Sequence, residues 1–152
     1  LYNRHCLHST LRDVAESTEP FCVVMGDIDD FKKINDTFGH DCGDVVLRSV
    51  AEIIMRNIGE KDIACRWGGE EMLMILHGTY DECYPKISKI KSEINALCLD
   101  HENRAVKVSM TFGFATSAEN ADIRSEGIDA MLSMVDKRLY KGKASGKNII
   151  VA

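Results

Sequence analysis

IACRWGGEEMLMIL, residues 63–76, is the stretch that decides the fold. It predicts two strands, 63–67 and 72–76, that flank Gly68-Gly69. Paired glycines permit the positive φ angles of a tight hairpin turn, so the two strands are expected to pair with each other.

Hydrophobic patterns predict the elements on either side of this hairpin. Apolar residues at helical spacing predict helices at 1–16, 44–58, 81–99 and 128–140. Apolar runs predict a buried strand at 21–25 and a short last strand at 148–151, and alternation over 105–115 predicts a half-buried strand. Without the first helix, the core order is β-α-β-β-α-β, followed by a helix and the terminal strand. This order predicts an α+β fold with a ferredoxin-like or palm-type mixed sheet and helices on one face.

Composition restricts the class of protein. The 152 residues fit one globular domain, and 45% hydrophobic with 28% charged residues argues against disorder. No apolar run approaches the roughly 20 residues that cross a bilayer, and no signal-peptide pattern opens the chain, so a cytoplasmic location is expected. The six cysteines contain no Cys-x-x-Cys, which argues against a zinc site. The formal charge of −5 argues against nucleic-acid binding, so a polyanionic nucleotide would need metal ions or a few lysines.

Polar residues gather at two places where strands are expected to end. Residues 27–36 follow the buried strand, and residues 66–72 form the tip of the hairpin. If the two strands are neighbours, Asp27 and Glu70 fall close together, and two adjacent carboxylates repel each other unless a cation lies between them. Proteins commonly hold Mg²⁺ through one or two carboxylates and the substrate's phosphates. The sequence therefore predicts a divalent-metal site between these strand ends.

Gly68 and Gly69 allow two interpretations. They can serve only as a tight turn, or they can let a ligand approach the backbone closely. The consecutive carboxylates Glu70 and Glu71 favour a ligand site, because they contribute little to a core.

The residues 68–72, GGEEM, resemble the signature of the GGDEF family, the diguanylate cyclases. The run DIDDFKKINDTFGHDCGD at 27–44 resembles the family's second block. DKRLY at 136–140 and KASGKN at 143–148 are similar to later blocks, and LYNR at 1–4 resembles a remnant of the opening motif. The blocks keep the family's order and spacing across nearly the whole chain. The resemblance implies a nucleotidyl cyclase-like sheet, in agreement with the predicted order of elements.

The resemblance implies that 1–152 is a single GGDEF catalytic domain from a longer multidomain protein, with a sensory or dimerisation region upstream. Two GTP molecules would condense into cyclic di-GMP with release of pyrophosphate, one GTP being held by each subunit of a two-fold homodimer. The 3′-hydroxyl of each GTP would attack the α-phosphate of the other. An isolated domain is expected to convert GTP slowly. The controlling signal and any membrane attachment of the full-length protein stay open.

The family pattern also implies metal ligands and catalytic groups. The ligands would be Asp27, the backbone carbonyl of Ile28, Glu70 and Glu71, and the cofactor Mg²⁺ or Mn²⁺, two ions per active site. Glu70 is the candidate base for the 3′-hydroxyl, although a direct metal ligand is a weak base. Glu71 can join the site only if the turn is distorted, because adjacent strand residues point to opposite faces. Lys32 would offset charge in the transition state, which makes the catalytic set Glu70, Lys32 and Glu71.

The residues implied to bind substrate are Asn35, His40, Asp44, Gly68, Gly69, Lys143 and Lys147. Asn35 and Asp44 match guanine-reading positions, and a good bidentate contact discriminates by roughly 1–3 kcal/mol. The alternatives are that Asp44 is only a charge at a helix N-terminus and that His40 is only a solvated turn residue. Lys143 and Lys147 would hold the terminal phosphates. Lys147 stands where the family commonly has arginine, so it keeps the charge but loses the bidentate fork.

Two positions depart from the family pattern. Met72 replaces the usual phenylalanine, and a flexible methionine can fill that volume without inactivating the protein. Many members carry an inhibitory product site, Arg-x-x-Asp, whereas this chain has GEKD at 59–62. Glycine can neither stack on guanine nor pair with phosphate, so no product-inhibition site is expected at Gly59-Asp62.

Three other hypotheses remain. A degenerate GGDEF module could bind GTP as a regulatory or interaction domain without turnover, but the metal and guanine positions are intact. A relative that makes a mixed purine cyclic dinucleotide is disfavoured by Asp44. A purely structural ferredoxin-like domain would leave the carboxylate cluster unexplained.

Overall fold

Strand β1 (Phe21–Ile28) is the central strand of a five-stranded sheet in the computed structural model, which describes residues 4–119 and 127–152. It pairs antiparallel with β3 (Glu71–His77) on one edge and with β6 (Met110–Thr116) on the other. Strands β2 (Ile63–Arg66) and β7 (Ile150–Val151) complete the order β2-β3-β1-β6-β7. Only the β6–β7 pair is parallel among the strand pairs of the described residues. The mixed sheet and the order of elements confirm the predicted fold class.

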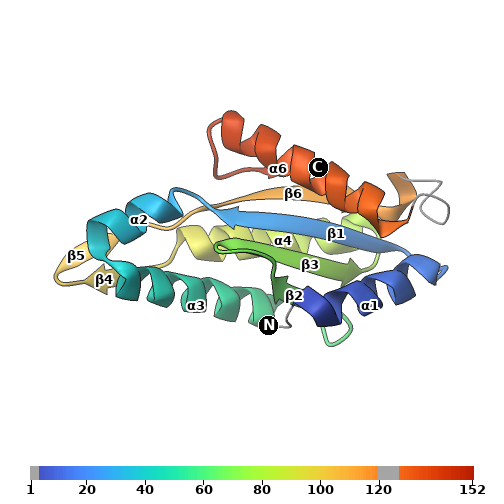
Figure 1. Cartoon of the computed structure of the whole chain (residues 1–152), viewed down its shortest axis with the longest axis horizontal. Coiled ribbons are helices and arrows are strands. Elements are labelled where there is room, and N and C mark those ends of the chain that lie inside the picture. The colour runs from blue at the N-terminus through green and yellow to red at the C-terminus, as the bar shows by residue number, and fades with distance from the viewer. Residues whose placement is uncertain (1–3, 120–126) are drawn as a thin grey trace.

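Helices cover both faces of the sheet, so the prediction that they lie on one face is wrong. Alternate residues of β1 enter two separate cores: Cys22 and Val24 pack with α3 (His40–Asn57) and α4 (Tyr80–Asn95). Val23 and Met25 pack with α1 (Arg4–Glu16) and α6 (Ile128–Ala144). Both faces of β1 are apolar, and each therefore needs a helical layer to exclude water. Figure 1 shows α6 running alongside β6.

The sheet differs from the predicted strands in two places. Strand β1 extends past Met25, so Asp27 and Ile28 belong to the strand and do not follow it. The pattern over 105–115 divides into β5 (Arg104–Val106) and β6, and every residue of β6 is buried, because helices cover both of its faces. The prediction of a half-buried strand over 105–115 is therefore wrong.

Three elements were absent from the prediction, one of them the short 3-10 helix Ser117–Glu119. Helix α2 (Phe31–Phe38) forms within the polar segment after β1, with Ile34 as its buried residue. Strand β4 (Leu99–His101) pairs with β5 in a separate hairpin, and the helix predicted over 81–99 ends at Asn95 as α4. Figure 1 shows α2 and this hairpin at one end of the sheet and α1 at the other.

The remaining predicted elements are present, several of them with shifted ends. Helix α3 starts at His40, before the predicted position 44, and α6 continues to Ala144, past the predicted end at 140. Three residues of the motif LYNR, 1–3, lie outside the described part of the chain. No helix in that part has the length and apolar character that a bilayer crossing requires.

The contact between α6 and the sheet depends on Gly113 of β6. A Cβ added at this position would lie 2.7 Å from the Leu139 backbone nitrogen and would collide with the Val135 carbonyl oxygen. Backbone atoms cannot rotate away as a side chain can. The absence of a side chain at Gly113 therefore sets how closely α6 approaches β6.

We expect Gly113→Ala to lower the free energy of unfolding by about 1–3 kcal/mol, because overpacking forces α6 outward. Urea denaturation followed by circular dichroism measures the change. Gly59→Ala is the matched control, since its added methyl would meet Asp62 Oδ2 only at 3.4 Å, an ordinary contact. If Gly59→Ala lowered the free energy of unfolding as much as Gly113→Ala does, this account of the α6 contact would be contradicted.

Candidate functional site

The end of β1 lies directly beside the tip of the β2–β3 hairpin. Asp27 is the register partner of Glu71, and the Ile28 N–H donates to the Glu70 carbonyl over 3.3 Å. The expected closeness of Asp27 and Glu70 is confirmed, because both line one pocket of about 420 Å³. This volume lies within the range of small-ligand sites.

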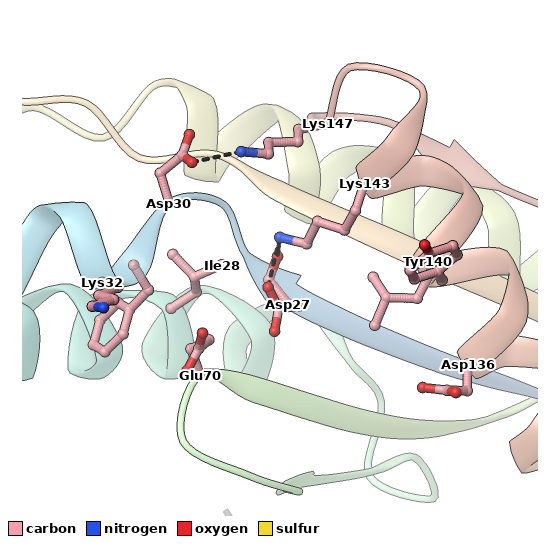
Figure 2. A pocket seen from close by; sticks show the side chains of 11 residues that line it. Asp27, Ile28, Asp30, Lys32, Glu70, Asp136, Tyr140, Lys143 and Lys147 are labelled. Atoms are coloured by element: carbon pink, nitrogen blue, oxygen red, sulfur yellow. Dashed lines mark hydrogen bonds and ion pairs between the residues drawn. The ribbon is translucent and has the colours of Figure 1, made fainter.

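The pocket draws its walls from the end of β1, the start of α2, the hairpin tip, α6 and the turn that follows α6. Its lining residues are Asp27, Ile28, Asp30, Phe31, Lys32, Glu70, Asp136, Leu139, Tyr140, Lys143 and Lys147. Figure 2 shows Lys143 reaching from α6 toward Asp27, while Glu70 projects from the hairpin tip into the same space. The structure therefore brings together five of the predicted metal, catalytic and phosphate-binding residues along with the Ile28 backbone.

Lys143 lies between two aspartates. Its Nζ is 2.6 Å from Asp27 Oδ1 and 2.6 Å from Asp29 Oδ1, and it also donates to the Asp27 carbonyl over 3.1 Å. Burial raises the pKa of the Asp27 carboxyl above its ordinary value, although Lys143 acts in the opposite direction. Burial also acts to raise the pKa of Asp29, but hydrogen bonds from Lys143, Thr111 and Ser109 hold it below the ordinary value. Asp27 is therefore the carboxylate of this pair that gains more from an added cation.

Lys147 lies nearer the solvent. Its Nζ pairs with Asp30 Oδ1 over 2.6 Å, and both side chains are about half exposed. The hydrogen bond to Asp30 raises the pKa of Lys147. Lys147 and Asn148 have φ angles of 66° and 50°, so two consecutive residues other than glycine are left-handed in this turn.

The two consecutive glutamates take different positions. Glu70 lines the pocket, and Glu71 is not among its lining residues. A Cβ added to Gly68 would lie 2.6 Å from Glu71 Oε2, so this carboxylate lies against the hairpin loop. Glu70 is better placed for a metal at Asp27, and the role of Glu71 stays a prediction.

The hairpin tip is a loop of residues 67–70, and neither Gly68 nor Gly69 uses the positive φ that glycine permits. Arg66 stabilises this loop: its Nε and Nη2 donate to the Gly69 carbonyl at 2.9 and 2.6 Å. A Cβ at Gly69 would meet no atom of the described residues within 4 Å. The space beside Gly69 suits a ligand near the backbone, but the turn geometry itself does not require glycine.

The predicted guanine-reading residues meet where α2 packs on α3. Asn35 Oδ1 is buried and has no hydrogen-bond partner within the described ranges. A Cβ at Gly43 would collide with this oxygen, so Gly43 makes the room that Asn35 occupies beside Asp44. Asp44 and His40 are exposed on α3. None of these residues lines the 420 Å³ pocket, so the structure holds them as a separate group at the other end of α2.

The sequence prediction missed Asp30, Asp136 and Tyr140 as pocket residues. Helical spacing could have found the last two, because positions 136, 140 and 143 recur on one face of α6. It also missed Asp29, whose contacts come from residues far away in the sequence.

Asp62 is the aspartate that remains of the product-site pattern, and its side chain binds groups inside the protein. Its carboxylate accepts hydrogen bonds from the N–H groups of Gly59 and His77, each at 2.8 Å, and from Lys86 Nζ at 2.7 Å. Its side chain is 3% exposed. Burial acts to raise the pKa of Asp62, but these donors together lower it below the ordinary value.

Comparison with known proteins gives a consistent set of relatives. The family model described as "Diguanylate cyclase, GGDEF domain" matches residues 1–149. Diguanylate cyclase A of Treponema denticola is 33% identical over 140 residues, covering 91% of this chain and 37% of that protein. Response regulator PleD of Caulobacter vibrioides is 33% identical over 158 residues, covering 99% of this chain and 34% of that protein. The chain thus spans about a third of the length of these relatives.

Solved structures agree with the sequence relatives. The GGDEF domain of DgcB from Caulobacter crescentus, in complex with c-di-GMP, superposes with a TM-score of 0.88 at 28% identity, covering all of this chain and 91% of that one. Diguanylate cyclase SiaD from Pseudomonas aeruginosa, in complex with its activator SiaC, gives 0.91 at 29% identity, covering 99% of this chain and 58% of that one.

The Asp62 contacts predict a pH-dependent contribution to stability. Because the folded pKa lies below the ordinary value, the stabilisation is complete above the ordinary aspartate pKa of about 3.9 and is lost as the pH falls through the folded pKa. We expect Asp62→Asn to lower the free energy of unfolding by about 1.5–3 kcal/mol at pH 7. Urea titrations of both proteins from pH 7 to pH 3 measure the difference, which should narrow toward pH 3. A difference that stays constant over this range would contradict the ionised role of Asp62.

Proposed function

Because this chain belongs to the GGDEF family of diguanylate cyclases, we propose that it joins two molecules of GTP into cyclic di-GMP. Each GTP loses one pyrophosphate, and two phosphodiester bonds close the ring. The observation that carries this proposal is the convergence of Asp27 and Glu70 with Lys143 and Lys147 in one pocket. Carboxylates for a metal and ammonium groups for phosphates are the two kinds of side chain that a metal–triphosphate complex needs.

The acidic side of the pocket fits a divalent cation. Burial disfavours the charged form of Asp27, and a cation beside it would offset that cost. The described residues contain no group of three or more His, Cys, Asp or Glu side chains that could hold a metal. Two carboxylates, the Ile28 carbonyl, water and phosphate oxygens are nevertheless a sufficient set for Mg²⁺, which is usually bound with few protein ligands.

The proposed ligands are Asp27, the carbonyl of Ile28 and Glu70, with Glu71 in support. The cofactor is Mg²⁺ or Mn²⁺, with two ions per active site. When bound, such ions neutralise the triphosphate and polarise the α-phosphate. Lys32, Lys143 and Lys147 would supply the remaining positive charge for the phosphates and the transition state.

The buried amide oxygen of Asn35 supports guanine as the nucleobase that the site binds. A buried amide oxygen without a partner costs about 1–3 kcal/mol, and an N–H donor of a bound ligand would remove that cost. Guanine presents N1–H and N2–H side by side, and the exposed carboxylate of Asp44 can accept both. Adenine has no such pair of donors, so Asp44 favours GTP over ATP. His40 and the backbone at Gly68 and Gly69 complete the proposed substrate contacts.

The reaction needs two copies of the domain. The product has two equivalent halves, so two subunits related by a two-fold axis can each present one GTP to the other. Glu70 is the proposed base that accepts the proton of the attacking 3′-hydroxyl. A sensory or dimerisation region elsewhere in the full-length protein would bring the subunits together. No product inhibition is proposed through residues 59–62, because the Asp62 carboxylate already accepts three internal hydrogen bonds.

Turnover by the dimerised protein tests this function. With GTP and Mg²⁺, chromatography should resolve cyclic di-GMP and pyrophosphate as products. We expect Glu70→Gln to lower kcat by at least about 100-fold, because the substitution removes both the metal ligand and the base. Glu60→Gln, which removes the same charge from an exposed loop residue, should keep wild-type kcat.

Two outcomes would contradict the proposal. An active Glu70→Gln variant would remove Glu70 from its assigned role. GTP binding without any product in the dimerised wild-type protein would favour the alternative, a GGDEF module that binds GTP for regulation without turnover.

A further inference from the structure

Asp29 is the most thoroughly hydrogen-bonded carboxylate near the pocket, and the proposed reaction gives it no part. Its side chain is 3% exposed. Oδ1 accepts from Lys143 Nζ and Thr111 Oγ1, both at 2.6 Å. Oδ2 accepts from Ser109 Oγ at 2.7 Å and from the Asn148 N–H at 3.0 Å. An ionised carboxylate offers about four acceptor sites, so protein donors already use all of them.

The position of Asp29 differs from that of Asp27, two residues earlier. Asp27 lines the 420 Å³ pocket, whereas Asp29 lines a separate hollow of about 1200 Å³ between α2 and the β4–β5 hairpin. Asp29 therefore reaches the pocket only through the groups that it binds. Its four acceptor sites are filled, so it has none left for a metal ion.

Two of the groups that Asp29 binds lead into the pocket. Lys143 is held between Asp29 and Asp27, so Asp29 keeps the ammonium in place even when Asp27 has another partner. The Asn148 N–H follows Lys147 directly in the left-handed turn. Left-handed residues other than glycine are strained and persist only where the surroundings hold them. The hydrogen bond from the Asn148 N–H to Asp29 is one such restraint, and it fixes the position of the neighbouring residue Lys147.

We propose that Asp29 is a positioning residue that holds Lys143 and the Lys147–Asn148 turn in place to receive the triphosphate, and that it is not a metal ligand. This inference rests on the proposed function, because it takes Lys143 and Lys147 as phosphate-binding residues. Asp29 acts through these lysines and touches neither the metal nor the nucleotide.

Binding measurements separate this role from the alternatives. The first probe is 3′-deoxy-GTP in the presence of Mg²⁺; this nucleotide lacks the attacking hydroxyl and cannot condense. The second is GMP, which lacks the terminal phosphates. The third is Mn²⁺ alone, whose binding is measured by electron paramagnetic resonance. Asp29→Asn should weaken 3′-deoxy-GTP binding about tenfold, the equivalent of one charge-assisted hydrogen bond. GMP and Mn²⁺ binding should change less than about threefold, since Asp44 and Asp27 are untouched. The matched control Asp100→Asn, an exposed aspartate on β4, should leave all three affinities near wild type.

A double-mutant cycle tests whether Asp29 acts through Lys143. In a Lys143→Met background, Asp29→Asn should cost less than about threefold in 3′-deoxy-GTP affinity, because the two residues work as one unit. If Asp29→Asn does not fold, Ser109→Ala removes one donor to Asp29 and should weaken 3′-deoxy-GTP binding by about two- to threefold without affecting GMP.

Several results would overturn the inference. Loss of Mn²⁺ binding in Asp29→Asn would make Asp29 a metal ligand, and equal losses for 3′-deoxy-GTP and GMP would make its role purely structural. Unchanged 3′-deoxy-GTP affinity, or additive losses in the cycle, would also exclude positioning through Lys143. If the wild-type protein itself bound no 3′-deoxy-GTP, the proposed function would fail first.

Discussion

Strand β1 is restrained in every direction, and the pocket depends on that restraint. Hydrogen bonds to β3 and β6 fix both of its edges, and two apolar cores cover its faces. Asp27, its only residue that is not buried, cannot shift relative to the hairpin tip or to α6. A fixed carboxylate flanked by Glu70 and Lys143 offers a metal–triphosphate complex a site that needs little reorganisation.

The charges of the pocket explain how an acidic protein can bind a polyanion. The chain has a formal charge of −5, yet three lysines line the pocket beside its carboxylates. Lys143 pairs with Asp27 at the end of β1, and Lys147 pairs with Asp30 directly after it. Opposite charges thus alternate across the pocket, which suits a ligand that carries both cations and phosphates.

The sequence predicted the features that depend on local pattern. The hairpin, the buried strand at 21–25 and the closeness of Asp27 and Glu70 follow from apolar runs and a turn signal, and the structure contains all three. It failed where local signals were weak. The β4–β5 turn uses Glu102 and Asn103 at positive φ without glycine, and α2 lies in a segment whose polar residues indicated chemistry more strongly than a helix.

Long-range contacts account for the rest of what was missed. Asp29 is bonded by Ser109, Thr111, Lys143 and Asn148, which lie 80 to 119 residues away in the sequence. Helices cover both faces of the sheet because both faces of β1 are apolar. The continuous apolar run at 21–25 already indicated this, but the order of elements alone favoured helices on one face. The glycines of the hairpin tip were recognised as important, but the loop of residues 67–70 keeps them at negative or extended φ.

The central claim is that Asp27 and Glu70 form one divalent-cation site with the triphosphate. Anomalous diffraction from crystals grown with Mn²⁺ and 3′-deoxy-GTP tests it most directly. The account predicts manganese peaks in the pocket, with carboxylate oxygens of both residues at about 2.0–2.6 Å, the range of Mg²⁺ and Ca²⁺ ligand distances. Manganese bound elsewhere, or a nucleotide bound with these two carboxylates away from any metal, would contradict it.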